Sequence, residues 1–475
     1  MSTHRNMNPV TVKRYLPWVV AVVLFMEQLD STIVYIAIPS MATSFDVPPL
    51  SLKAVVASYF LSLAVCIPLS GWMADRFGTR KVFAWAVGLF TLSSIFCGLS
   101  VNVSMLVAGR VLQGMSAAMM MPVGRLSVIR TFPKSELLPA MNFVIIPALI
   151  APLLGPSVGG LILHWFSWRD IFFVNLPVGL VAQWMIYRYM PDYKSDFRRP
   201  LDVMGLALFG TGSALLFWLL EIFGEHRLHP ISAGILFVVV IGFYVTYGVR
   251  SSRVAHPLLD LALFKVRTFR ISVVGGSVTR IGLGGMPFLL PLLYQLSWGL
   301  PAWKSGLLMM PLAIGAIGMK LVAPNLLARY GFRNVLMVNT VMIGSTIFLF
   351  SFINVGTPVL FILLLSLAQG SLNSLQFSSM NSMAYADIDA RSSSMASTMA
   401  SSMQQLSIGF GLASASLLTA FYLGDVLQTQ PGAIKRALGY TFTSLGIFTM
   451  VSSVSFWLLR RGDGSAVSLN VVNTR

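Results

Sequence analysis

Two carboxylic acids and an arginine interrupt long apolar segments of this chain, and charges in such places generally have a chemical task. Glu27 and Asp30 lie inside the apolar segment Pro17–Ile38, and Arg110 lies inside Ser104–Ile129. An ionisable group surrounded by hydrocarbon is costly, so it faces a partner or a path for ions or protons. A carboxyl group beside an arginine can bind and release a proton, and Asp30, Glu27 and Arg110 are therefore candidates for proton coupling.

Helix geometry predicts that Asp30 and Arg110 lie at the same depth in a membrane. At ~1.5 Å per residue, Asp30 lies ~20 Å from the start of its segment, whereas Arg110 lies ~9 Å from the start of a segment that runs the other way. In a hydrocarbon core ~30 Å thick, these two depths coincide. Two interpretations stay open: a permanent ion pair that joins two helices, or a pair that breaks and re-forms as a proton binds.

Glu27 lies one helical turn from Asp30, so both acids are on one helix face. Two carboxylates that close in a medium of low dielectric cannot easily both be charged, which favours a shared proton. Arg280 lies at a similar depth, ~18 Å into its own segment. Glu27 could therefore instead neutralise Arg280, or attract a cationic ligand.

Composition indicates that helices in a lipid bilayer position these residues. Apolar residues make up 56% of the 475 residues and charged residues only 10%, and apolar windows of ~20 residues, each long enough to span a bilayer, recur along the chain. We count fourteen such windows, which predicts an all-α integral membrane protein. The net charge of +17 is concentrated in alternate loops and both termini, which by the positive-inside rule predicts cytoplasmic termini and argues against nucleic acid as a partner.

A short charged turn joins the second and third apolar windows, Ala54–Ala74 and Val82–Ser100. It gathers cations beside one acid at a membrane face, where ion pairs could latch one conformation. Asp75 could pair with Arg76, Arg80 or Arg329; a solvated loop without a latch is the alternative. The residues predicted to form this conformational latch are Asp75, Arg76, Gly78, Arg80 and Lys81.

Internal repetition predicts two similar halves. The turn around Gly78 recurs around Gly331, 253 residues later, and Gln113-Gly114 recurs as Gln369-Gly370, 256 residues later. The repeat predicts two six-helix bundles with two additional helices inserted between them. The predicted divisions are a bundle over residues 1–190, two linker helices with their loops over 191–267, a second bundle over 268–462, and a short tail over 463–475.

These motifs resemble those of the major facilitator superfamily, and more narrowly its fourteen-helix drug:proton antiporters. The turn Gly71–Lys81 is similar to the superfamily's loop between helices two and three, Leu29–Pro39 to the antiporters' first-helix motif, and Arg110–Gly114 to their fourth-helix motif. Tyr35 departs from the usual Asn, and Glu27 is an additional acid. The resemblance implies a proton-relay role for Arg110, which favours the breakable pair with Asp30.

The fifth apolar window resembles the antiporter motif of the same family. Gly155, Pro156, Gly159 and Gly160 carry this likeness, and the resemblance implies that the motif seals the bundle in one state. Close backbone approach at the glycines and a bend at Pro156 are the physical basis, with plain tight packing as the alternative.

The substrate cavity is the least defined part of the prediction. Methionine and aromatic side chains make adaptable apolar walls, and polar or charged side chains among them could orient a ligand. For each candidate, packing between helices is the alternative. The candidate cavity residues are Arg280, Met120, Phe143, Phe288, Tyr294, Gln376 and Asn381.

The predicted function is that of a proton-coupled antiporter which exports lipophilic or cationic small molecules, such as drugs, by alternating access. The alternative is a proton-coupled exporter of one metabolite, such as an organic acid or a siderophore-like anion. The two cysteines lie inside apolar windows and no nucleotide-binding loop is present, so no metal, cofactor or enzyme activity is expected. The expected partners are the substrate, protons and lipids of the bacterial inner membrane, and a monomer is expected.

Overall fold

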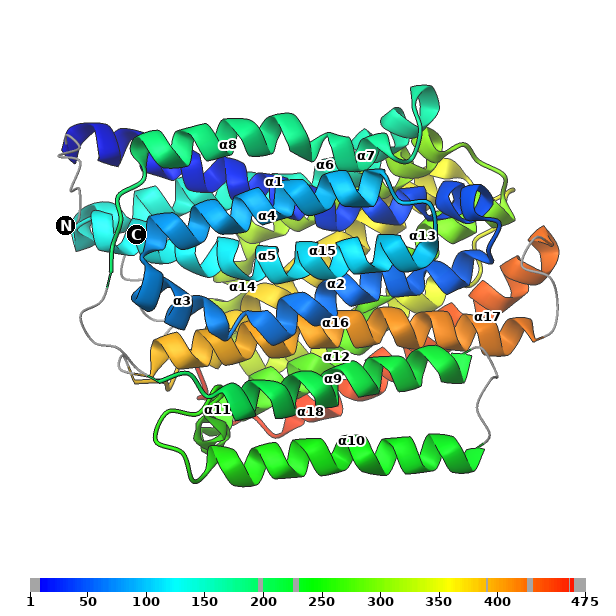
Figure 1. Ribbon diagram of the computed structural model, residues 1–475. Coiled ribbons are helices and arrows are strands. Elements are labelled where there is room, and N and C mark those ends of the chain that lie inside the picture. Colours follow the sequence, from blue (N-terminus) through cyan, green and yellow to red (C-terminus); the bar gives the residue numbers. More distant parts are fainter. Residues whose placement is uncertain are drawn as a thin grey trace.

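A computed structural model describes residues 9–194, 200–224, 230–389, 392–424, 430–460 and 462–464, and in these residues the chain is helical with no β-strand. The helices run roughly parallel to one another (Figure 1), and the predicted all-α fold is confirmed. The helices are α1 Pro9–Phe45, α2 Lys53–Cys66, α3 Leu69–Phe77, α4 Thr79–Gly98, α5 Val103–Thr131, α6 Lys134–Trp165, α7 Asp170–Phe173, α8 Asn175–Tyr189, α9 Val203–Gly224, α10 Pro230–Ser251, α11 Arg267–Arg270, α12 Gly276–Gly284, α13 Met286–Leu292, α14 Ala302–Leu349, α15 Val359–Ala384, α16 Ser393–Leu423, α17 Pro431–Ser452 and α18 Val454–Trp457.

Within the described residues, 12 helices are long and apolar enough to cross a membrane, or up to 13 if the bent pair Pro139–Pro152 and Leu154–Trp165 is one span. One of the 12 is α14, which has 48 residues and a non-helical backbone at Gly331 where two helices join. At ~1.5 Å per residue, α14 is ~70 Å long, more than twice a hydrocarbon core of ~30 Å. The count of fourteen spans therefore stays a prediction that the break in α14 supports.

The predicted internal repeat is visible in the backbone at two turns. Gly78 has φ +97° and Gly331 has φ +74°, a conformation that side chains other than glycine rarely adopt. Gly78 ends α3 before α4, and Gly331 joins the two parts of α14. The same sharp turn thus occurs at the same place in each repeat.

Side-chain contacts repeat as well. Gln113 of α5 bonds Ser94 of α4, and Gln369 of α15 bonds Thr346 in the second part of α14. The glycines that follow both glutamines also behave alike, because each packs directly on a backbone carbonyl of a neighbouring helix. These equivalences support the prediction of two related helical bundles.

Two helices, α9 and α10, stand between the repeats in the chain and lie at the outside of the molecule. The ring of Phe217 in α9 stacks on Phe410 of α16 with a centroid separation of 4.7 Å, and α9 also contacts α2. α10 packs on the outer side of α9 (Figure 1). α9 is therefore in contact with helices of both repeats.

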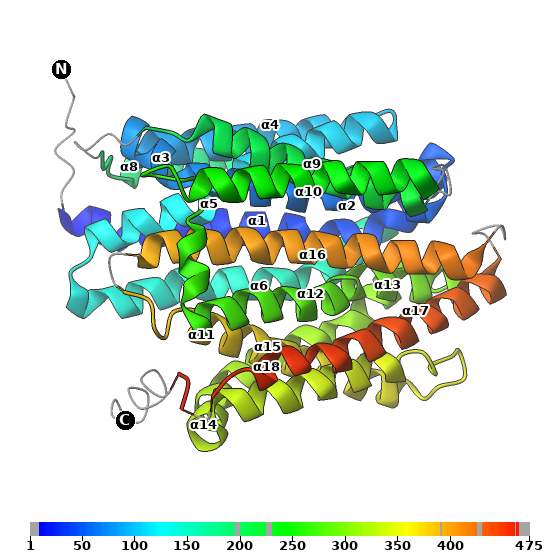
Figure 2. The same cartoon turned by 90° about the horizontal axis from the view of Figure 1, so that it is seen from below.

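The two faces of the molecule are named here by the chain ends. The terminal face holds the start of α1, the turn between α3 and α4, and the end of the α17–α18 helix; the distal face is the opposite one (Figures 1 and 2). Helices of the first repeat lie on one side in Figure 2 and helices of the second on the other, with α1, α6 and α16 between them. The candidate site residues Asp30 and Arg110 lie on α1 and α5 of the first repeat.

Candidate functional site

The structure brings Asp30 and Arg110 together in a buried ion pair. Arg110 Nη1 lies 2.6 Å from Asp30 Oδ2, and both side chains are 0% exposed. α1 and α5 run in opposite directions from the two faces, which is why residues at such different distances from their helix starts meet. Four other ion pairs of the described residues, by contrast, each have at least one partner that is partly exposed.

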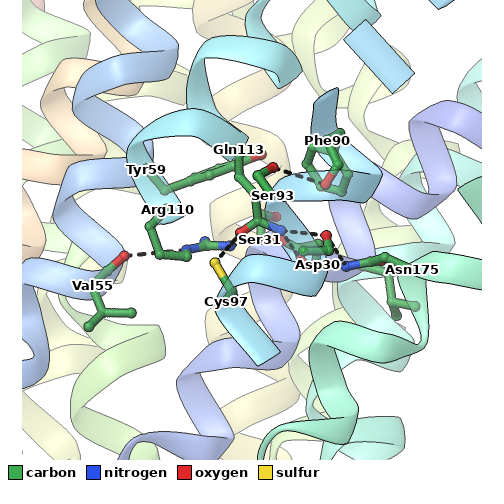
Figure 3. Close-up of polar contacts among 12 residues, drawn as sticks. Asp30, Ser31, Val55, Tyr59, Phe90, Ser93, Cys97, Arg110, Gln113 and Asn175 are labelled. Carbon is green, nitrogen blue, oxygen red and sulfur yellow. Dashed lines mark hydrogen bonds and ion pairs between the residues drawn. The ribbon is translucent and has the colours of Figure 1, made fainter. Parts of the chain in front are cut away.

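Neutral polar side chains complete the coordination of Asp30 (Figure 3). Its Oδ1 accepts a hydrogen bond from Asn175 Nδ2 at 2.6 Å and another from Gln113 Nε2 at 3.2 Å. Ser94 Oγ lies 2.7 Å from Gln113 Nε2 and 3.2 Å from Asn175 Nδ2. Together with Arg110, the amides of Asn175 and Gln113 therefore make three donors to the carboxylate of Asp30, an arrangement that matches its charged form.

Arg110 is held from its other side by α2. Its Nε donates to the carbonyl of Val55 at 3.3 Å, and its guanidinium carbon lies 4.3 Å from the centroid of the Tyr59 ring. Nη1 also donates to Gln113 Oε1 at 2.7 Å, whereas Nη2 is buried with no hydrogen-bond partner among the described residues. The network ties α1, α2, α4, α5 and α8 to one carboxylate, so a change in the charge of Asp30 would loosen several helix contacts at once.

Only Asp30 and Arg110 of this network were predicted as site residues from the sequence; Gln113, Ser94, Asn175, Tyr59 and Val55 were not. Asn175 lies in the segment that follows the antiporter motif, and its amide is 2% exposed. A polar side chain at the start of an apolar helix was the available signal. It was weak because such a residue commonly caps a helix instead.

Glu27 is buried as well, but it has no such coordination. Its side chain is 3% exposed, and Oε2 has no hydrogen-bond partner. The ion pairs found among the described residues do not include Glu27. Arg280 is not joined to Glu27 by an ion pair in the described part of the chain, so their mutual neutralisation stays a prediction without support from this conformation.

The charged turn between α3 and α4 is held within its own half. Asp75 Oδ1 lies 3.3 Å from Arg130 Nη2 of α5, so the predicted pairing with Arg76, Arg80 or Arg329 is corrected. Arg76 instead lies over the ring of Trp72 at 5.4 Å, and the backbone amide of Arg80 donates to Asp192 at 3.1 Å. The last turn of α5 lies beside α3, which brings Arg130 to Asp75.

Gly78 and Lys81 complete the description of this turn. A Cβ atom on Gly78 would lie 2.4 Å from Asp192 Oδ1, so both the positive φ and the close carboxylate require glycine there. Lys81 is exposed at the surface.

The glycines of the fifth window are contact points on two different helices. A Cβ on Gly155 would lie 2.2 Å from Thr32 of α1, and one on Gly159 would lie 2.7 Å from Ile33 of the same helix. A Cβ on Gly160 would lie 2.7 Å from the carbonyl of Ala302 at the start of α14. The motif therefore packs α6 against its own half and against the other half.

Three hydrogen bonds also join the two halves toward the distal face. Gln295 Nε2 donates to the carbonyl of Ile36 at 3.0 Å. Ser157 Oγ donates to the carbonyl of Gly306 at 3.5 Å, and Ser416 Oγ to the carbonyl of Leu50 at 3.4 Å. Together with the glycine contacts, these bonds close the two halves against each other at the distal face.

The seven predicted cavity residues do not gather in one place. Met120, Phe288 and Tyr294 are fully buried among apolar neighbours, as the packing alternative expects. Gln376 is bonded to Asn339 and Thr340 within the second repeat. Each of these four side chains thus makes contacts inside the protein and does not line an open cavity in this conformation.

Phe143, Arg280 and Asn381 are in different surroundings. Phe143 is 37% exposed and, with Trp18, lines a pocket of about 330 Å³ between the starts of α1 and α6. Arg280 is 4% exposed and lies 5.1 Å from the ring of Phe377, and Asn381 is exposed on the same helix as Phe377. Among the described residues, no group of three or more His, Cys, Asp or Glu side chains could hold a metal ion.

Comparison with known proteins identifies the family. The sequence profile of the Major Facilitator Superfamily matches residues 20–412. A relative from Serratia proteamaculans is 36% identical over 441 residues, which cover 92% of each chain, and one from Citrobacter koseri is 36% identical over 451 residues, which cover 93% of this chain and 94% of the relative. Both are named as multidrug resistance protein MdtD.

Solved structures of low sequence identity share the fold. A bacterial homologue of the human lysosomal transporter Spinster, in an inward-facing and occupied conformation, superposes with a TM-score of 0.69 at 10% identity and covers 95% of this chain and 97% of its own. A D-xylose–proton symporter superposes with a TM-score of 0.67 at 14% identity and covers 95% of this chain and 99% of its own. The chain is a multi-pass membrane transporter, not an enzyme, and it belongs to the major facilitator superfamily.

Proposed function

We propose that this transporter exports lipophilic or cationic small molecules, drugs among them, in exchange for protons. The buried Asp30–Arg110 pair with its shell of neutral donors carries the proposal. A carboxylate kept in the bundle interior at such cost is a natural proton carrier. The names of the relatives support small-molecule export. The protein acts as a monomer in the bacterial inner membrane, with the terminal face in the cytoplasm.

Coupling follows from what protonation does to the network. A neutral Asp30 loses its charge attraction to Arg110 and accepts the Asn175 and Gln113 hydrogen bonds more weakly. Arg110 then depends on the Val55 carbonyl, Gln113 and the Tyr59 ring. α1 becomes freer to move relative to α2, α5 and α8, so proton binding and the opening of the bundle favour each other. Glu27, one turn away, shares the proton or attracts a cationic substrate.

In alternating access, the two halves are in contact at the distal face in one state and at the terminal face in the other. The distal end is closed by the glycine contacts and by the hydrogen bonds from Gln295, Ser157 and Ser416. Export requires these contacts to open while the halves approach each other at the terminal face. The turn at Asp75 is the proposed latch of that second state, and Gly155–Gly160 is the proposed seal of the first.

Transport by purified protein tests this function. Proteoliposomes are loaded with acidic buffer and diluted into alkaline buffer that contains ethidium, and retained ethidium is measured after filtration. We expect ethidium to accumulate against its gradient, and a protonophore to abolish the accumulation. Uptake that persists when the pH gradient has been dissipated would reject proton coupling.

Asp75→Asn is expected to slow turnover several-fold and to leave ethidium affinity near normal. The Asp75–Arg130 pair is partly exposed, and such a pair is worth ~0.2–1 kcal/mol, enough to shift a conformational balance but too far from Asp30 to reshape a binding site. Initial rates and equilibrium binding of ethidium separate the two effects. Glu136→Gln, which removes another exposed pair at 2.8 Å from Lys13, is the control and should behave as wild type. Loss of equilibrium binding in folded Asp75→Asn protein would contradict the latch role.

A further inference from the structure

Arg280 is a buried cation with no counter-charge among the residues that the structure describes. Its side chain is 4% exposed, and its Nε has no hydrogen-bond partner in that part of the chain. No ion pair or hydrogen bond joins its guanidinium to any described residue. The described contact of the guanidinium is a cation–π contact with the ring of Phe377, whose centroid lies 5.1 Å from Cζ. A guanidinium with five donors in a buried place requires acceptors, so an acceptor from outside the chain is expected there.

The surroundings of Arg280 lead toward the terminal face. Phe377 and Asn381 of α15 and Tyr385, the residue that caps its C-terminal end, are spaced four residues apart, so they lie along one helix face. Phe377 is half-buried, whereas Asn381 and Tyr385 are exposed, Tyr385 by 39%. An aromatic ring, an amide and a phenol thus follow one another along this helix face, from the ring that Arg280 contacts to exposed residues at the end of α15.

A second arginine within the bundle, Arg125 of α5, belongs to the other half. Arg125 is half-buried, and its Nε also has no hydrogen-bond partner. Each half therefore presents an arginine that has no ion pair among the described residues, and Arg280 is the more deeply buried of the two.

We propose that Arg280 binds a carboxylate group of the exported molecule, with the Tyr385 hydroxyl as a second donor and Phe377 as an apolar wall. A planar guanidinium fits a carboxylate through two parallel hydrogen bonds, and the ring beside it suits an aromatic or aliphatic body. This inference rests on the proposed function and adds to its substrates a preferred class, lipophilic molecules that carry a carboxylate, alone or beside a cationic group.

Three fluorescent probes that differ in charge test the site directly. Dansylglycine carries a carboxylate, dansylamide is neutral and dansylcadaverine is cationic, and all share one fluorophore. Equilibrium binding to purified wild-type protein is measured by fluorescence enhancement without a proton gradient. We expect dansylglycine to bind most tightly. Equal or weaker binding of dansylglycine than of dansylamide would overturn the proposal.

Substitution then assigns the preference to Arg280. Arg280→Gln should weaken dansylglycine binding about 10- to 100-fold, the range expected for lost hydrogen bonds to a charged group, and should leave dansylamide unchanged. Arg280→Lys should retain part of the preference. Arg270→Gln removes an exposed arginine of α11 and is the control. Unaltered dansylglycine binding by Arg280→Gln would refute the role of Arg280.

Two further measurements keep the result interpretable. Tyr385→Phe removes only the hydroxyl of an exposed residue, so this variant remains informative if Arg280→Gln fails to fold. Tyr385→Phe should weaken dansylglycine binding a few-fold and leave dansylamide binding unchanged. Equal effects on both probes would count against the site. Binding needs no gradient, so failure of ethidium–proton exchange would reject the proposed function without deciding the carboxylate site.

Discussion

Asp30→Asn is expected to abolish pH-driven ethidium accumulation, a loss of at least about 100-fold, while the protein still inserts and folds. Asparagine has the size of aspartate and keeps one acceptor oxygen for Asn175 and Gln113, which reach Asp30 at 2.6 and 3.2 Å. It cannot bind and release a proton, and it no longer neutralises Arg110, 2.6 Å away. Breaking a buried pair by removing one charge costs ~3–5 kcal/mol, so the conformational balance shifts as well.

The measurement is accumulation in proteoliposomes together with counterflow, in which ethidium exchanges for ethidium and no net proton movement is needed. We expect Asp30→Asn to lose accumulation and to retain counterflow, because substrate exchange does not require the carboxyl to titrate. Asp170→Asn, at the start of α7 on the distal face, is the control with an acid outside the network. Wild-type accumulation by Asp30→Asn protein would reject Asp30 as the proton carrier.

Gly306→Val is expected to prevent closure of the distal face and thereby to stop transport. A Cβ on Gly306 would lie 2.4 Å from the carbonyl oxygen of Pro156 in the other half, a distance that side chains do not tolerate, and valine adds two further methyl groups. Overpacking of this kind costs ~1–3 kcal/mol, which shifts a two-state equilibrium about 5- to 150-fold. The shift should favour the conformation in which α6 and α14 are apart at the distal face.

Accessibility at the distal face measures this shift. Ser416 is fully buried where it bonds the carbonyl of Leu50, so a Ser416→Cys protein should react slowly with a membrane-impermeant maleimide. Adding Gly306→Val should raise that labelling rate and eliminate ethidium transport. Gly318→Val is the matched control, because it lies in the same helix and a Cβ there would meet nothing within 4 Å. Unchanged labelling in the Gly306→Val protein would show that the α6–α14 contact does not close this face.

The main features that could be predicted were those that depend on position along a helix. Apolar length predicted membrane helices, and helix rise predicted the common depth of Asp30 and Arg110, which the structure places 2.6 Å apart. The repeat around Gly78 and Gly331 appears as a positive φ at both residues. Predictions that depended on which side of a helix a residue faces were less successful. Glu27 and Arg280 lie at similar depths, yet no ion pair joins them in the described part of the chain.

The sequence by itself determined the family, the all-helical membrane fold and the candidate proton carrier. Hydropathy, helix rise and bilayer thickness depend only on position along the helix axis, and residue numbers give that position directly. Only the tertiary structure decided which side chains surround that carrier and which charges lack partners. Asn175 and Ser94 join Asp30, Arg130 takes Asp75, and Arg280 is left beside Phe377. These outcomes depend on how helices are rotated and which ones are neighbours. Packing over the whole bundle decides both, and the periodicity of any single helix does not contain that information.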